Sequence, residues 1–77
     1  MRKKNINIKQ FLKEFNEEYD FLYEHDYVAG YDEAVEEFDI FAKKNSSFVC
    51  EFVKYRKDFI SSDREAAAFM FALSKYM

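Results

Sequence analysis

The sequence has no proline, one glycine (Gly30) and one cysteine (Cys50). Sheets and hairpins depend on turn residues, which this chain almost lacks, so an all-α fold is predicted. A single cysteine cannot form an internal disulfide, which is typical of a reducing compartment. The longest apolar run, residues 66–73, is far shorter than the ~20 residues that span a bilayer. The basic start, residues 1–10, lacks the apolar core of a signal peptide, so a cytoplasmic protein without a membrane partner is expected.

The chain of 77 residues is short enough to form one helical domain, residues 1–77. A domain of this size buries only about 60% of its unfolded surface and is marginally stable. Ten phenylalanines and six tyrosines can supply a core, because each buried aromatic removes roughly 150–250 Å² from water. Charged residues make up 35% of the chain, and this balance excludes a disordered chain.

Apolar residues recur at helical spacing and predict about four helices, at 8–24, 27–43, 47–60 and 63–76. The first two apolar stripes are out of phase by roughly 140° if one straight helix is imposed. A break between His25 and Asp32 resolves this, with Gly30 as a helix stop and Asp26 or Asp32 as a cap.

Residues 43–47, KKNSS, predict a connection in which Ser46 or Ser47 caps the third helix. A strand remains an alternative for 48–56, because β-branched and aromatic residues are dense there. Ser62 and Glu65 match a capping box that opens the last helix. This helix is apolar on almost every side, which predicts a homodimer formed through it. The expected interface residues are Phe69, Met70, Phe71, Leu73 and Tyr76.

The charges are segregated along the chain, although the net charge is only −3. Between Lys13 and Lys43 there are eleven carboxylates and no Lys or Arg, and the remainder of the chain holds all 12 basic residues and four acids. Residues 14–39 can form two antiparallel helices, each about 20 Å long. If their carboxylates share one surface, its charge density is about one carboxylate per 2 Å of length. Duplex DNA carries about one charge per 1.7 Å.

Two apolar residues, Phe21 and Ile40, fall on the acidic sides of their helices. Apolar residues surrounded by charges are typical of interface anchors, and packing against another helix is the alternative. The sequence therefore predicts phosphate-mimicking carboxylates with two apolar anchors. The predicted partner-binding residues are Glu17, Phe21, Glu24, Glu33, Glu36, Glu37, Asp39 and Ile40.

Residues that could support catalysis are few. The helical neighbours of His25, the single histidine, include no carboxylate that could share a metal or orient its ring. Cys50 has no histidine nearby in the sequence, and the acids around Gly30 do not match a calcium loop. We therefore expect no catalytic residues, no metal and no cofactor.

These features favour a non-enzymatic protein that occupies the basic surface of a larger nucleic-acid-handling protein or complex and inhibits it. Inhibitors of restriction or CRISPR enzymes from phages and other mobile elements are similar in size and charge, without a shared motif. One alternative is a structural or adaptor homodimer whose acidic face only aids solubility. Another, less favoured because the chain is acidic overall, is a nucleic-acid-binding regulator. Its basic residues would be Lys43, Lys44, Lys54, Arg56 and Lys57.

Overall fold

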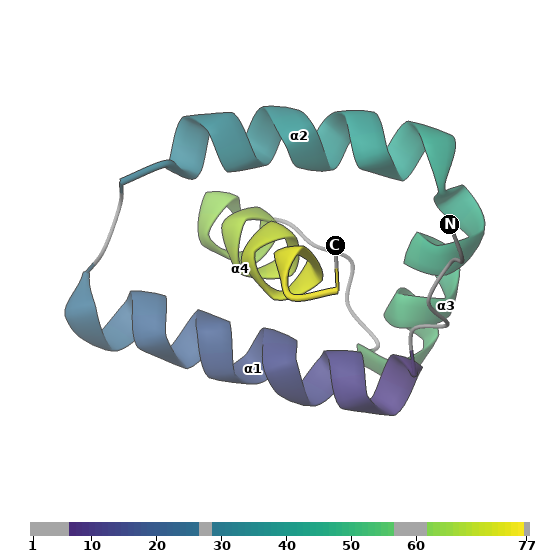
Figure 1. Ribbon diagram of the computed structural model, residues 1–77, viewed down its shortest axis with the longest axis horizontal. Helices are drawn as coiled ribbons and strands as arrows, with labels where there is room; N and C mark the ends of the chain where they lie inside the picture. Colours follow the sequence, from purple (N-terminus) through teal and green to yellow (C-terminus); the bar gives the residue numbers. More distant parts are fainter. Residues whose placement is uncertain (1–6, 27–28, 57–61, 77) are drawn as a thin grey trace.

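The computed structural model describes residues 7–26, 29–56 and 62–76. These residues form four helices: α1 (Ile8–His25), α2 (Tyr31–Lys44), α3 (Ser46–Arg56) and α4 (Asp63–Ser74) (Figure 1). The all-α prediction is confirmed, and residues 48–56 are helical rather than a strand. The described residues of the third predicted helix end at Arg56, so its expected extension to 60 lies outside them.

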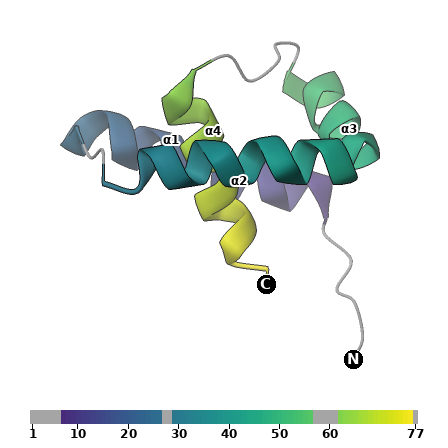
Figure 2. The ribbon, with the colours of Figure 1, turned by 90° about the horizontal axis from the view of Figure 1, so that it is seen from above.

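The helix α4 is the centre of the fold. It passes between α1 and α2, which run in opposite directions on two sides of it (Figure 1). Seen from above, α4 crosses beneath α2 and its C-terminal half emerges on the side away from α3 (Figure 2). The helix α3 closes one end of this arrangement and contacts both α1 and α2.

The caps of the first two helices differ from those expected. Asn7 caps α1 with its side-chain oxygen, which accepts from the Lys9 and Gln10 amides at 3.0 and 3.1 Å. Asp26, in the left-handed conformation (φ 50°), ends α1, and its amide donates to the Leu22 carbonyl. Gly30 (φ 81°) is the N-cap of α2 and not the stop of α1. Aspartate can take the left-handed conformation that ends α1, which leaves Gly30 to begin α2.

The connection between α2 and α3 is a single residue, Asn45, and is shorter than predicted. Its backbone amide and its side-chain amide both donate to the Phe41 carbonyl, at 2.8 and 3.1 Å. The Asn45 carbonyl in turn accepts from the Phe48 and Val49 amides. Asn45 therefore ends one helix and begins the next, and Ser46 and Ser47 are already helical.

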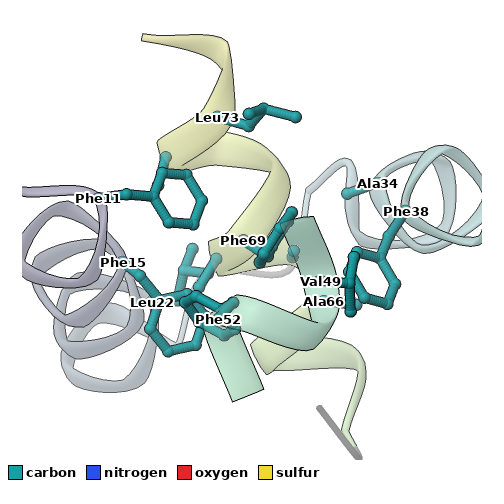
Figure 3. Packing of buried hydrophobic residues seen from close by; sticks show 13 residues of the cluster. Phe11, Phe15, Leu22, Ala34, Phe38, Val49, Phe52, Ala66, Phe69 and Leu73 are labelled. Atoms are coloured by element: carbon teal, nitrogen blue, oxygen red, sulfur yellow. The ribbon is translucent and has the colours of Figure 1, made fainter. Parts of the chain in front are cut away.

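Phe69 of α4 lies at the middle of an aromatic core, between Phe11 of α1 and Phe38 of α2 (Figure 3). Its ring centroid is 4.9 Å from that of Phe11, 5.0 Å from Phe38 and 5.1 Å from Phe52, in edge-to-face contacts. Edge-to-face pairs add roughly 0.5–1.5 kcal/mol each beyond the burial of area. The buried residues are Phe11, Phe15, Leu22, Ala34, Phe38, Val49, Phe52, Ala66, Ala67, Ala68, Phe69, Ala72 and Leu73.

The apolarity of α4 is accounted for within one chain. Its residues 66–69 are all buried, and small alanines allow neighbouring helices to approach closely. Of the expected dimer interface, Phe69 and Leu73 are at most 3% exposed, so these two side chains lie in the core of the single chain and not on its surface. Met70, Phe71 and Tyr76 are half-buried. Homodimer formation stays a prediction. The apolar side chains of α4 no longer serve as its reason, because the single chain already covers most of them.

Both ends of the connection between α1 and α2 are joined to α4 through Arg64. The Arg64 Nε donates to the Tyr31 hydroxyl at 3.2 Å, and its guanidinium lies 5.1 Å from the centre of the Tyr23 ring. A longer ion pair, 3.8 Å, reaches Asp26. The predicted cap before Arg64 is confirmed: the Glu65 amide donates to the Ser62 hydroxyl oxygen at 3.2 Å.

Candidate interaction surfaces

The side of α2 that faces away from the core is acidic. Ala34 and Phe38 are buried, and the residues on the other side of the helix are exposed. Ile40 lies among the carboxylates of this side with 56% of its surface exposed. The five exposed carboxylates of this helix, here called the α2 face together with Ile40, are Asp32, Glu33, Glu36, Glu37 and Asp39.

The outer side of α1 has the same character with fewer exposed carboxylates. Glu17, Asp20 and Glu24 are exposed, and Phe21 is 47% exposed beside them. The Phe21 ring stacks on His25 with 4.3 Å between the ring centroids. Phe21 and Ile40 are therefore exposed, as their helical phase predicts.

The two acidic sides do not form one surface. The helices α1 and α2 lie on opposite sides of α4, and each turns its buried residues toward it, so their outer sides point in opposite directions (Figure 1). The expectation that all eleven carboxylates act along one surface is wrong in this respect. The carboxylate density to compare with duplex DNA is therefore that of a single helix. The α2 face carries more exposed acids than the outer side of α1.

Two of the eleven carboxylates between Lys13 and Lys43 are paired with a lysine that sequence reasoning did not consider. The Lys75 ammonium, at the end of α4, lies 3.1 Å from a carboxylate oxygen of Glu14 and 3.0 Å from one of Glu18. The hydrogen bond from Lys75 holds the pKa of Glu14 below its ordinary value, and the bonds to Glu18 and Glu14 raise the pKa of Lys75. A lone lysine at the end of an apolar helix is the signal that could have indicated this role.

The pairing of Lys75 gives folding stability a defined pH dependence. A lowered Glu14 pKa means that the pairing is complete above about 4.5 and is lost as the pH falls through the folded value. A raised Lys75 pKa means that its share is complete below about 10.5 and is lost as the pH rises through the folded value. Lys75→Met is therefore expected to lower the melting temperature slightly at pH 7. It is also expected to reduce the fall in melting temperature between pH 7 and pH 3, because the pairing that acid removes is already absent.

Thermal unfolding by circular dichroism of wild type and K75M at the two pH values measures this effect. Lys44→Met is the matched control, because Lys44 is exposed at the end of α2 and has no ion pair with a described carboxylate. If the melting temperature falls by the same amount between pH 7 and pH 3 in wild type, K75M and K44M, the role given to Lys75 is contradicted.

The basic residues of the nucleic-acid alternative are only partly described. Lys43 and Lys44 are exposed at the end of α2, and Lys54 is exposed on α3. Lys57 and the side chain of Arg56 lie outside the described residues. Cys50 is an exposed free thiol on α3, in a shallow hollow of about 570 Å³ whose described lining residues all belong to this helix.

The described ranges hold no group of three His, Cys, Asp or Glu side chains placed to bind a metal. None of the helices in the described part of the chain is long and apolar enough to cross a bilayer. No family model, curated protein or solved structure matches this chain. The functional argument therefore depends on the surfaces themselves.

Proposed function

We propose that this protein is a non-enzymatic inhibitor that binds, through the α2 face, the basic surface with which a larger protein holds nucleic acid. The observation that carries the proposal is the exposed Ile40 within five exposed carboxylates on one side of one helix. A solvated helix needs no large apolar residue at such a position, whereas a binding surface uses one as an anchor.

The charge spacing of α2 supports the mimicry of nucleic acid. Asp32 to Asp39 extends over roughly 10 Å at 1.5 Å per residue, which gives about one carboxylate per 2 Å. This density is close to the one charge per 1.7 Å of duplex DNA. The comparison therefore still applies when the α1 carboxylates are left out.

The absence of neutralising partners also supports the proposal. In the described part of the chain, the α2 carboxylates form no ion pair with Lys or Arg, whereas Glu14 and Glu18 of α1 are held by Lys75. Carboxylates that are free of internal partners can meet cations of another protein at a smaller cost of desolvation and rearrangement. Glu17, Glu24 and Phe21 form a smaller second surface on the opposite side, which we assign to a peripheral contact. We place the protein in the cytoplasm, where its exposed Cys50 stays reduced.

The test is competition with nucleic acid. The tagged protein is incubated with extract of the cell that produces it, and the bound proteins are eluted with a short DNA duplex at constant ionic strength. We expect the captured protein to be a nucleic-acid binder that the duplex displaces. We expect it to bind the Ile40→Ser variant at least tenfold more weakly than wild type, because an anchor of this size contributes about 1.5–3 kcal/mol when buried.

Elution by salt but not by the duplex at matched ionic strength would contradict the mimicry. The control variant is Tyr55→Ser on α3, because Tyr55 is also a large exposed side chain, 50% exposed, and lies outside the α2 face. Equal weakening by Y55S and I40S would contradict the anchor role of Ile40.

A further inference from the structure

A groove lies between the N-terminal part of α2 and the C-terminal part of α4, beside the α2 face. Its volume is about 440 Å³. Its α4 residues lie in the C-terminal half of that helix, the half that emerges from beneath α2 (Figure 2). Its lining includes Glu33, Ala34 and Glu37 of α2 and Met70, Phe71 and Ser74 of α4.

The floor of the groove is apolar and its rim is acidic. Met70 and Phe71 are half-buried and pack against the core, and Ala34 is buried beside them. Glu33 and Glu37 on α2 are exposed and stand one helical turn apart, about 6 Å along the axis. An apolar floor beside two carboxylates is complementary to a polypeptide segment that carries an apolar side chain between two cations. An anionic or wholly apolar segment would leave the carboxylates of the rim unpaired.

The cation of α4 nearest in sequence to the groove is used elsewhere. Ser74 lines the groove, and its hydroxyl donates to the Phe71 carbonyl of its own helix at 2.6 Å. The next residue, Lys75, is bound to Glu14 and Glu18 of α1, on the other side of α4. The groove therefore keeps its negative rim, because Lys75 is held by α1.

We infer that the groove between α2 and α4 binds a basic amphipathic segment of the partner, in which one apolar side chain contacts Phe71 and Met70 while two Lys or Arg residues one turn apart pair with Glu33 and Glu37. This inference rests on the proposed function and names the chemistry that the surface recognises. It extends the contact from the outer side of α2 onto α4.

The probe is a synthetic helical peptide of about 14 residues, with lysines at i and i+4 and a leucine at i+3 on one face. Its binding to the full chain is measured by fluorescence anisotropy, and its location by ¹⁵N–¹H shift changes. We expect the largest shifts at 29–37 and 70–74. Replacing the leucine of the peptide by alanine is expected to weaken binding about tenfold, because the apolar contact is lost.

Two double variants on the same helix separate the groove from general acidity. Glu33→Gln with Glu37→Gln removes the rim and is expected to weaken binding about tenfold, from two exposed ion pairs. Glu36→Gln with Asp39→Asn removes the same charge from α2 without touching the groove lining and is expected to cost less than threefold. Circular dichroism melting confirms that all variants fold.

Equal weakening by the two double variants would contradict the groove and leave the α2 face as the binding surface. If the peptide changes the ¹⁵N–¹H shifts of residues on the outer side of α2 only, the groove is likewise contradicted. A protein that is dimeric and dissociates as the peptide binds would assign the groove to a second copy of this chain and overturn the inference. Absence of saturable peptide binding at low salt, together with capture that is insensitive to duplex DNA, would contradict both this inference and the proposed function.

Discussion

Phe69→Ala is expected to lower the free energy of unfolding by about 3–5 kcal/mol. The Phe69 side chain has no exposed surface, and its ring contacts rings of α1, α2 and α3 within 6.0 Å. Loss of such a side chain costs about 3–5 kcal/mol through the transfer of apolar surface and the cavity that remains. A domain of this size is stable by only about 4–12 kcal/mol, so the substitution removes between roughly a quarter and all of its stability.

Urea unfolding followed at 222 nm measures the effect. The matched control is Phe21→Ala, which deletes the same atoms from a position that is 47% exposed on α1. We expect F21A to lower the free energy of unfolding by about 1 kcal/mol or less. A similar loss in F21A and F69A would contradict the central position of α4 in the fold.

Reversal of three charges on α2, Glu33→Lys with Glu36→Lys and Glu37→Lys, is expected to abolish binding to the partner. The change of six charge units replaces attraction to a basic surface by repulsion, and we expect at least a hundredfold loss of affinity. The fold is expected to remain, because these side chains are exposed and the present acids repel one another along the helix. Surface plasmon resonance against the captured partner gives the affinity, and circular dichroism gives the helix content.

The outer side of α1 provides a control of equal charge. Glu17→Lys with Asp20→Lys and Glu24→Lys changes the net charge by the same six units on the opposite side of the molecule (Figure 1). A general electrostatic attraction responds equally to the two triple variants, whereas binding through the α2 face is reduced far more by the α2 triple. If the α1 triple causes the larger loss, the binding surface has been placed on the wrong helix.

The helices could be predicted from the sequence because apolar periodicity records which side of a segment is buried. The predicted starts at Ile8 and Asp63 agree with the structure, and the Ser62 cap is confirmed. The ends of the middle helices were harder. Asn7, Asp26 and Asn45 act as caps through conformations and bonds that several residue types can make, so their identity alone does not reveal these roles.

The candidate site could be predicted in part. The helical phase of Phe21 and Ile40 is a local property, and it correctly indicated that both are exposed. The separation of the two acidic sides is a tertiary property, since it follows from the position of α4 between α1 and α2. The groove likewise combines Glu33 and Glu37 with Phe71, residues that periodicity within single helices cannot bring together.

The central place of α4 has a kinetic consequence. Phe11 and Phe69, which are in contact in the core, come from near opposite ends of the sequence. Most helical bundles fold rapidly because their contacts are local, and long-range contacts slow folding through the entropy of closing large loops. In the described part of the chain, α1 and α2 do not contact each other and each has only a small contact with α3, so most of their apolar surface is buried only when α4 docks between them. We therefore expect the docking of α4 to limit the rate of folding, and folding to be slower than that of a bundle whose neighbouring helices pack in sequence order.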